Sequence, residues 1–205
     1  MNDHEILTDI IQHRRSVRRF LNKPVVRETL DRLVEAASWA PSAGNRQDWL
    51  FTVVTSSEVK EKMAKKVRDR WAEIIDNNRQ MAGIEEIEHY TSGFADFSGA
   101  PVIIVVSSQT TQSVQRHLLG ENADATVGSA ASAAMAAQNL MLAAHAFGLG
   151  SCCMTGALAA RREIAGILDL GKRHEPICLI ALGYADEKPV APTRKTLQEI
   201  VRYVT

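Results

Sequence analysis

Residues 123–150 read ADATVGSAASAAMAAQNLMLAAHAFGLG, and this stretch decides which fold the chain adopts. Its apolar residues lie all around a helix, which indicates a helix that is buried rather than half-exposed. We expect it to run for roughly 25 residues, about 37 Å at 1.5 Å per residue, and to end at Gly148. Alanine and serine stand where a membrane-spanning helix carries leucine and isoleucine, so we expect no insertion into a membrane.

The side chains of this helix are too small to fill a core alone. Alanine and serine allow neighbouring backbones to approach closely, so the helix needs close neighbours on several sides. A subunit interface would supply them, and we expect the helix to lie there. The alternative is the central helix of a monomer, which also needs only to be apolar all round.

Periodicity predicts helices and strands on both sides of this helix. We expect helices at about 6–13, 26–39, 58–78 and 161–168, and strands at about 49–55, 101–107, 151–154 and 176–182. Residues 196–204 predict a short strand or helix. Residues 79–98 are irregular, typical of a long loop or broken helix that lines a pocket. The sum is an α+β fold, with a central mixed or antiparallel sheet surrounded by helices.

Length and charge narrow the function classes. The 205 residues suit a single domain, 1–205, with a C-terminal tail from about 187 to 205. Twenty-four basic residues balance 24 acidic ones, so we expect no general attraction for nucleic acid or for a membrane surface. The opening residues 1–5, MNDHE, lack the basic start and apolar run of a signal peptide, and we expect a cytoplasmic protein.

Several common sites are absent from the sequence. It has no Gly-rich dinucleotide or P-loop fingerprint and no G-x-S-x-G elbow. The six histidines form no zinc motif, so we expect no metal. Cys152, Cys153 and Cys178 lie in apolar stretches, and we interpret all three as buried thiols in a reducing compartment.

A basic cluster follows the first predicted helix. Residues 14–20 read RRSVRRF, and in an extended backbone Arg14, Ser16 and Arg18 share one face. Guanidinium groups beside a hydroxyl suit a phosphate dianion. The alternative is a solvated basic turn.

Three further segments could hold a ligand. Residues 40–49, APSAGNRQDW, present the amides of Asn45 and Gln47, which could read a heteroaromatic ring edge, although the loop is also an ordinary turn. Residues 148–156, GLGSCCMTG, allow a close backbone approach, or form a helix cap followed by a strand. Arg194 could contact a phosphate or be a surface charge.

Taken in order, these segments resemble the FMN-dependent nitroreductase family over nearly the whole chain. The matching motifs are R-R-S-V-R-x-F, then A-P-S-x-x-N-x-Q-x-W, then A-x-Q-N-L-x-L-A-A-x-x-x-G-L-G-S-C from residue 136, A-L-G-Y from residue 181, and Arg194. The resemblance implies a nitroreductase-like fold and a homodimer with FMN at the subunit interface. The residues that it implies for the cofactor are Arg14, Arg15, Ser16, Arg18, Pro41, Ser42, Asn45, Gln47, Thr155, Gly156 and Arg194.

The resemblance also implies the chemistry. NADH or NADPH would give a hydride to flavin N5, and a nitroaromatic, quinone or enone would then take it in a ping-pong cycle. No catalytic side chain is expected. The alternatives are a specialised flavoenzyme of the same family, of dehydrogenase, dehalogenase or flavin-cleaving type, and a non-catalytic redox sensor. One departure is Asp48, where many relatives have proline; residues 79–98 match nothing that we can place.

Overall fold

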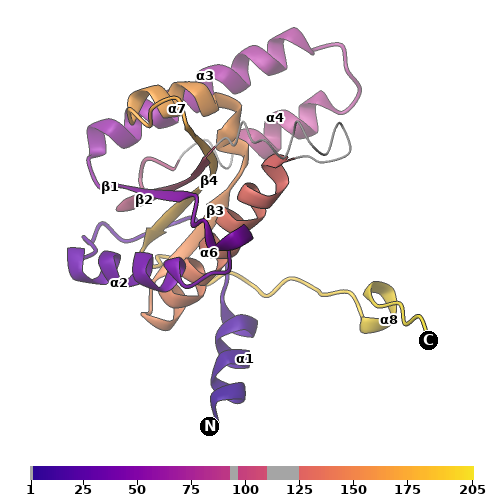
Figure 1. Cartoon of the computed structure of the whole chain (residues 1–205). Helices are drawn as coiled ribbons and strands as arrows, with labels where there is room; N and C mark the ends of the chain where they lie inside the picture. The colour runs from indigo at the N-terminus through magenta and orange to yellow at the C-terminus, as the bar shows by residue number, and fades with distance from the viewer. Residues whose placement is uncertain (1, 93–96, 110–124) are drawn as a thin grey trace.

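The computed structural model describes residues 2–92, 97–109 and 125–205, and it places a four-stranded sheet between two layers of helices (Figure 1). In order across the sheet, the strands are β1 (Trp49–Val54), β2 (Val102–Gln109), β4 (His174–Gly183) and β3 (Gly150–Met154). Every neighbouring pair is antiparallel. The expected α+β class is confirmed, with an antiparallel sheet.

The helices follow the predicted ranges closely. They are α1 (Asp3–His13), α2 (Arg27–Ser38), α3 (Ser57–Asn77), α4 (Ile84–Ser92), α6 (Ala125–Ala146), α7 (Arg161–Ile167) and α8 (Leu197–Ile200), with 3₁₀ turns η1 (Ala43–Asn45) and η3 (Gly156–Ala160). In the irregular region 79–98, a regular helix, α4, forms after a short turn at Gly83, and residues 93–96 lie outside the described residues. The predicted helix start at 123 and 124 also lies outside them.

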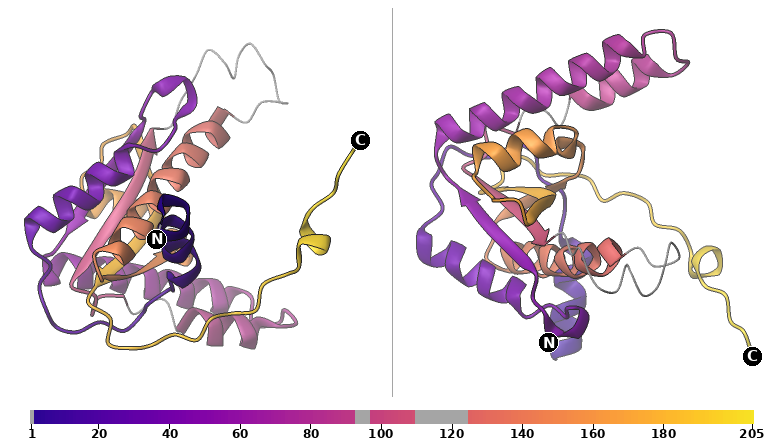
Figure 2. Two further views of the ribbon diagram at one scale, coloured as in Figure 1. Left: turned by 90° about the horizontal axis from the view of Figure 1, so that it is seen from below. Right: turned by 45° about the horizontal axis from the view of Figure 1, so that its top comes forward.

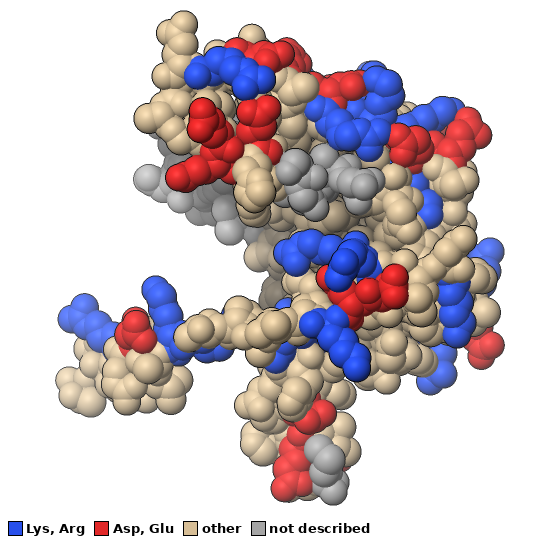
Figure 3. Space-filling model, turned by 180° about the vertical axis from the view of Figure 1, so that it is seen from behind, with Lys and Arg blue, Asp and Glu red and all other residues tan. Residues whose placement is uncertain are grey.

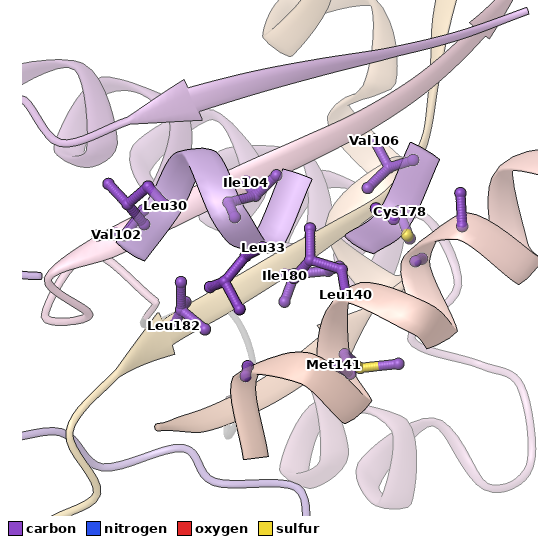
Figure 4. Packing of buried hydrophobic residues seen from close by; sticks show 14 of the residues in the cluster. Leu30, Leu33, Val102, Ile104, Val106, Leu140, Met141, Cys178, Ile180 and Leu182 are labelled. Atoms are coloured by element: carbon purple, nitrogen blue, oxygen red, sulfur yellow. The ribbon is translucent and has the colours of Figure 1, made fainter. Parts of the chain in front are cut away.

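Strand β2 is buried almost throughout because helices cover both faces of the sheet (Figure 2). Alternate side chains therefore enter two separate cores. Val102, Ile104 and Val106 pack toward α2 and α6, as the close view shows (Figure 4). Ile103 and Val105 pack on the opposite face, toward α3 and α7. This explains why the sequence of β2 is a continuous apolar run rather than an alternating one.

Helix α6 is not buried all round in the single chain. Small side chains such as Ala133, Ala136 and Ala137 pack against α2 and the sheet. The opposite face is exposed along its length, at Ala131, Ala134, Met135, Gln138 and Ala146. The expectation of complete burial is therefore wrong for one protomer, because α2 and the sheet cover only one side of the helix.

The two ends of the chain project from the body (Figures 1 and 2). Helix α1 begins with a capping box between Asn2 and Glu5, but its 11 residues bury no side chain within the described chain. The tail after Asp186 extends away from the sheet and exposes apolar side chains, with Val190 91% and Tyr203 85% exposed. Among the described residues, the structure contains no helix with the length and hydropathy that crossing a bilayer requires.

Candidate functional site

The basic cluster lies along the free edge of β3. Ser16 forms a parallel bridge with Ser151, and the Val17 amide donates to the Ser151 carbonyl at 3.0 Å. Phe20 forms a second bridge, antiparallel, with Ala185. These contacts confirm the extended backbone on which the predicted phosphate site depends, and they place this segment beside the strand that leads to Thr155.

Two glycines make this arrangement possible. Gly148 adopts φ 73°, the left-handed conformation that ends α6. At Gly150, a Cβ atom would lie 2.8 Å from the Cβ of Val17, closer than real side chains approach. The helix cap that the sequence offered is therefore present at Gly148, whereas the close approach at Gly150 is to Val17 of the same chain; the predicted approach to a ligand or a second chain stays a prediction.

A carboxylate that the sequence did not reveal holds the basic cluster. Glu187 accepts hydrogen bonds from the backbone amides of Arg18, at 2.5 Å, and Arg19, at 3.0 Å. The amide of Arg18 is the main cause that lowers the pKa of Glu187 below its usual range. No sequence motif links Glu187 to residues 18 and 19, which lie far from it in the sequence. The contact forms because the chain that leaves β4 passes beside the basic cluster.

A cavity of about 360 Å³ opens where the cluster meets the end of β3. It is lined by Arg18, His89, Tyr90, Cys152, Cys153, Met154, Thr155 and Gly156. The structure thus brings together three of the predicted site residues, Arg18, Thr155 and Gly156. The region 79–98 also lines this cavity through α4, as its sequence predicted. Its volume lies in the range of small-molecule sites.

The turn at the inner end of the cavity is fixed from behind. Trp71, on α3, donates its indole N–H to the carbonyl of Gly156 at 3.0 Å. Its ring packs against the core on that side of the sheet. Because this bond occupies the Gly156 carbonyl, it limits rotation of the adjoining peptides. Trp71 is a second contributor that the sequence analysis did not identify.

The first two arginines of the cluster behave differently. Burial, followed by the charges of His13 and Arg14, lowers the pKa of His145, whereas Asp9 raises it, so Arg14 lies close enough to the end of α6 to act on His145. Arg15 instead donates to the carbonyls of Gln12 and Arg14, at 2.5 and 2.8 Å. In the single chain, its guanidinium therefore caps the end of α1.

The loop before β1 adopts a strained backbone. Gly44, Asn45 and Gln47 have φ values of 61°, 52° and 52°, in the left-handed region that few non-glycine residues occupy. The Gln47 amide side chain donates to the Asn45 side-chain oxygen at 3.2 Å, and Ser42 Oγ accepts from the backbone N–H of Gln47 at 3.0 Å. Pro41 is exposed. Strain of this kind is common in ligand-binding loops.

Asp48 ties the same loop to α6. Its carboxylate accepts from Arg46 Nε at 2.8 Å and from Ser129 Oγ at 3.3 Å. The side chain is only 14% exposed. Its charge is thus used within the loop, and it is not among the residues that line the cavity beside β3.

The structure of one chain leaves the predicted residues in four places. Arg18, Thr155 and Gly156 line the cavity, and Arg14, Arg15 and Ser16 precede Arg18 on the segment that runs beside β3. Pro41, Ser42, Asn45 and Gln47 lie on the loop at the N-terminal half of α6. Arg194 is exposed on the tail, which runs away from the body (Figure 1). Acidic and basic side chains are intermingled on the body of the molecule and on the C-terminal tail in the face seen in Figure 3, whereas the projecting helix α1 carries acidic side chains and no Lys or Arg.

One expectation about the cysteines is wrong. Cys152 and Cys178 are buried, but Cys153 is exposed. Alternation along β3 turns Cys153 to the opposite face from Cys152, and β3 lies at the end of the strand order, with β4 on one side and the short extended segment around Ser16 on the other. Within the described ranges, the structure contains no cluster of His, Cys, Asp or Glu that could hold a metal ion.

The chain is similar to known proteins over most of its length. The model of the nitroreductase family matches residues 11–184. YodC of Bacillus subtilis, which carries the name NAD(P)H nitroreductase, is 28% identical over 94% of this chain and 96% of its own. A 4-nitrobenzoate reductase of Pseudomonas putida is 25% identical over 98% of this chain and 96% of its own.

Two solved structures share the fold. A BluB-like flavoprotein from Clostridium difficile 630 superimposes with a TM-score of 0.87 and 25% identity, covering 97% of this chain and 99% of its own. A nitroreductase with bound FMN from Desulfitobacterium hafniense DCB-2 gives a TM-score of 0.76 at 23% identity, with full coverage of both chains.

Proposed function

Because the chain belongs to the nitroreductase family, we propose that it is an FMN-dependent oxidoreductase that passes hydride from NADH or NADPH to a small organic acceptor. The acceptor would be a nitroaromatic, a quinone or an enone. The observation that carries the proposal is the cavity in which Arg18, Thr155 and Gly156 meet beside the free edge of β3. The names of the relatives, NAD(P)H nitroreductase and 4-nitrobenzoate reductase, support it.

The residues present fit FMN. Arg14 and Arg18 bring positive charge to the extended segment, and Ser16 adds a hydroxyl, which together suit a phosphate and an electron-rich ring edge. Burial is the main cause that lowers the pKa of His145, and the nearby positive charges, among them Arg14, lower it further; a bound phosphate would offset that second effect. When bound, FMN supplies hydride transfer through its N5 atom.

The protein's own groups would position and polarise the ring. Backbone N–H groups of Thr155 and Gly156 would donate to it, and Trp71 would hold that turn in place through its bond to the Gly156 carbonyl. Arg18 would stabilise negative charge on the reduced ring. No side chain acts as a covalent nucleophile, and the last proton comes from solvent or substrate.

His89 and Tyr90 form the wall of the cavity contributed by α4. A nicotinamide and an acceptor would occupy the space beside this wall in turn, which gives a ping-pong cycle. The three free thiols agree with a reducing compartment, and we place the protein in the cytoplasm. The two cores share β2 and β4, which supports a single domain over residues 1–205.

The site is completed by a second copy of the chain in this proposal. The loop with Pro41, Ser42, Asn45 and Gln47 would cover the flavin bound by its partner, which explains why one chain leaves it apart from the cavity. The exposed apolar face of α6, the unburied α1 and the apolar tail would form the homodimer interface. Arg15 would be free to join the phosphate site only if it released the end of α1.

Anaerobic titration tests the function directly. The purified protein should be yellow, and NADH or NADPH should bleach its flavin absorbance in the absence of oxygen. A panel of quinones, enones and nitroaromatics should then restore the colour at rates that depend on the acceptor. If neither nucleotide reduces the bound flavin, the reductase assignment is wrong.

The phosphate site has a separate test. We predict that Arg14→Ala weakens FMN binding by about 1.5–3 kcal/mol, the range for the loss of one charge-assisted contact. Fluorescence titration with FMN measures it. Arg27→Ala is the matched control, because Arg27 is exposed on α2 and forms its ion pair with Asp31 one turn along the same helix. Equal affinities of the two variants would contradict the role of Arg14.

One comparison favours a second candidate function. The TM-score to the BluB-like flavoprotein, 0.87, exceeds the 0.76 to the FMN-bound nitroreductase. A specialised flavoenzyme of the same family would then be the alternative. Bound flavin that ignores both nicotinamide nucleotides, in a protein that consumes free reduced FMN, would favour this alternative.

A further inference from the structure

The exposed thiol of Cys153 lies within the candidate flavin cavity and has no part in the reaction proposed above. It lines the same hollow as Thr155 and Gly156. Cys152, the preceding residue, is buried in the core on the α3 side. Both residues line the cavity, but Cys152 is only 4% exposed, so Cys153 is by far the more accessible of the two neighbouring thiols.

The thiol of Cys178 lies beside that of Cys153 and lowers its pKa. Cys153 pairs with Ile180 across β3 and β4, so Cys178 lies two positions away on the same face of the sheet. The Cys178 thiol donates a hydrogen bond to Cys153, and this bond lowers the pKa of Cys153 to about 7, assisted by Arg14 and opposed by burial. The same bond and burial raise the pKa of Cys178.

The asymmetry between the two thiols follows from their exposure. The proton leaves Cys153 because solvent reaches that sulfur, whereas Cys178 is enclosed by the core near α6. The other titratable or charged groups around the cavity are Arg18, His89, Tyr90 and Cys152. Reactive cysteines characteristically occupy partly exposed, electropositive surroundings of this kind.

We propose that Cys153 is a nucleophilic site which carbon electrophiles of the Michael-acceptor class alkylate, and that this adduct and FMN exclude one another from the cavity. The sulfur attacks the β-carbon of the acceptor, and a C–S bond forms as the C=C π bond breaks. The resulting enolate takes a proton from water. No electrons are gained or lost overall, so the step requires no oxidant or reductant.

The proposal has a consequence for acceptor choice. Enones and quinones belong to the acceptor class proposed above, and they are also Michael acceptors. With FMN in place, they would be reduced; without it, they would be captured by the thiol. Only the competition with FMN rests on the proposed function, whereas the reactivity of Cys153 stands on the geometry of β3 and β4.

N-ethylmaleimide is the probe, and peptide mass spectrometry of the full-length chain reads the adduct at each cysteine. Without added FMN at pH 7, Cys153 should be labelled about tenfold or more faster than Cys152. The rate should rise with pH through a midpoint near 7. Cys178→Ala should slow labelling about tenfold at pH 7 and little at pH 9, since the thiol then ionises near its ordinary pKa of about 8.5. Cys152→Ala is the matched control and should leave the rate unchanged.

The outcomes test the reactivity of Cys153 separately from its competition with FMN. Labelling of Cys153 that is no faster than that of Cys152, or a midpoint near 8.5 in the wild type, overturns the proposal even if Cys178→Ala fails to fold. With FMN bound, as its absorbance shows, labelling should fall about tenfold or more, in proportion to occupied sites. Unchanged labelling at full occupancy overturns the shared cavity. If FMN does not bind at all, the proposed function fails, while the rates in its absence still decide whether the thiol is reactive.

Discussion

At the scale of single residues, side chains distant in sequence fix the segments that line the cavity. Glu187 holds the amides of Arg18 and Arg19, and Trp71 holds the carbonyl of Gly156. Neither would touch a ligand in the cavity described here. Their role is to remove alternative backbone conformations, so that the donors are already oriented when a ligand arrives.

The carboxylate of Glu187 should make stability depend on pH. We predict that Glu187→Gln lowers the free energy of unfolding by about 1 kcal/mol at pH 7. The variant loses the charge that strengthens two hydrogen bonds, and partial exposure of the side chain to solvent keeps this loss small. The folded state lowers the pKa of Glu187. The stabilisation is therefore complete above the unfolded value of about 4.3 and is lost as pH falls through the folded value.

Urea denaturation at several pH values measures this difference. The gap between wild type and Glu187→Gln should be largest near neutral pH and should close in acid. Glu58→Gln is the control, because Glu58 is an exposed residue of α3 whose partner is Lys62; its effect should be much smaller. A gap for Glu187→Gln that is constant down to pH 3 would contradict the assignment.

Because residue 48 is aspartate and not proline, Gln47 can adopt its left-handed backbone conformation. Gln47 has φ 52°, whereas a residue before proline is restricted to extended conformations. We predict that Asp48→Pro destabilises the protein by about 2–3 kcal/mol, and Asp48→Ala by about 1 kcal/mol through loss of its bonds to Arg46 and Ser129. Thermal or urea unfolding compares them. A proline variant as stable as the alanine variant would show that Gln47 tolerates an extended backbone.

At the scale of elements, periodicity predicted the helices and strands well because each buries a regular set of side chains. The apolar run of β2 and the alanines of α6 are strong signals of this kind. Helix α4 was not predicted as a regular helix because it is short and charged and begins directly after a turn at Gly83. The exposure of Cys153 could not be predicted, since edge strands are defined by the order of the sheet and not by local sequence.

The site residues also divide into those that a local sequence pattern predicted and those that depend on the arrangement of the strands. The extended cluster and the turn at Gly156 are close in space because both adjoin β3, an adjacency that the sequence alone does not contain. It was the resemblance to the family's motifs that predicted this adjacency. Glu187 and Trp71 belong to no motif, and pairing across such separations has no periodic signature.

The exposed face of α6 carries the next prediction. If that face packs on a second copy, Ala134→Glu should place a buried charge in the interface and convert the homodimer to a monomer. Analytical ultracentrifugation measures the mass, and FMN affinity should fall with it. Ala72→Glu is the matched control, because Ala72 is an exposed alanine of α3. A dimer that survives Ala134→Glu with unchanged affinity would place the interface elsewhere.

At the scale of the whole molecule, the proposed function requires that each chain supply two separate parts of a shared site. The cavity beside β3 has the cluster and the turn, but the strained loop faces α6 and Arg194 lies on the projecting tail. An exposed apolar tail is unfavourable for an isolated protein, and burial against a second copy would remove that cost. We expect the tail to pack on the partner and to carry Arg194 toward a phosphate.

Removal of the tail should therefore separate folding from assembly. A chain that ends at Pro189 keeps Glu187 and both cores, so it should unfold within a few degrees of the full chain, while it sediments as a monomer and binds FMN more weakly. Full-length Arg194→Ala is the control: it should remain a dimer and lose about 1.5–3 kcal/mol of FMN binding. If the shortened chain were still a dimer with wild-type affinity, neither the interface nor the phosphate site would involve the tail. If it lost its fold, the tail would instead be part of the core of each protomer, against its present exposure.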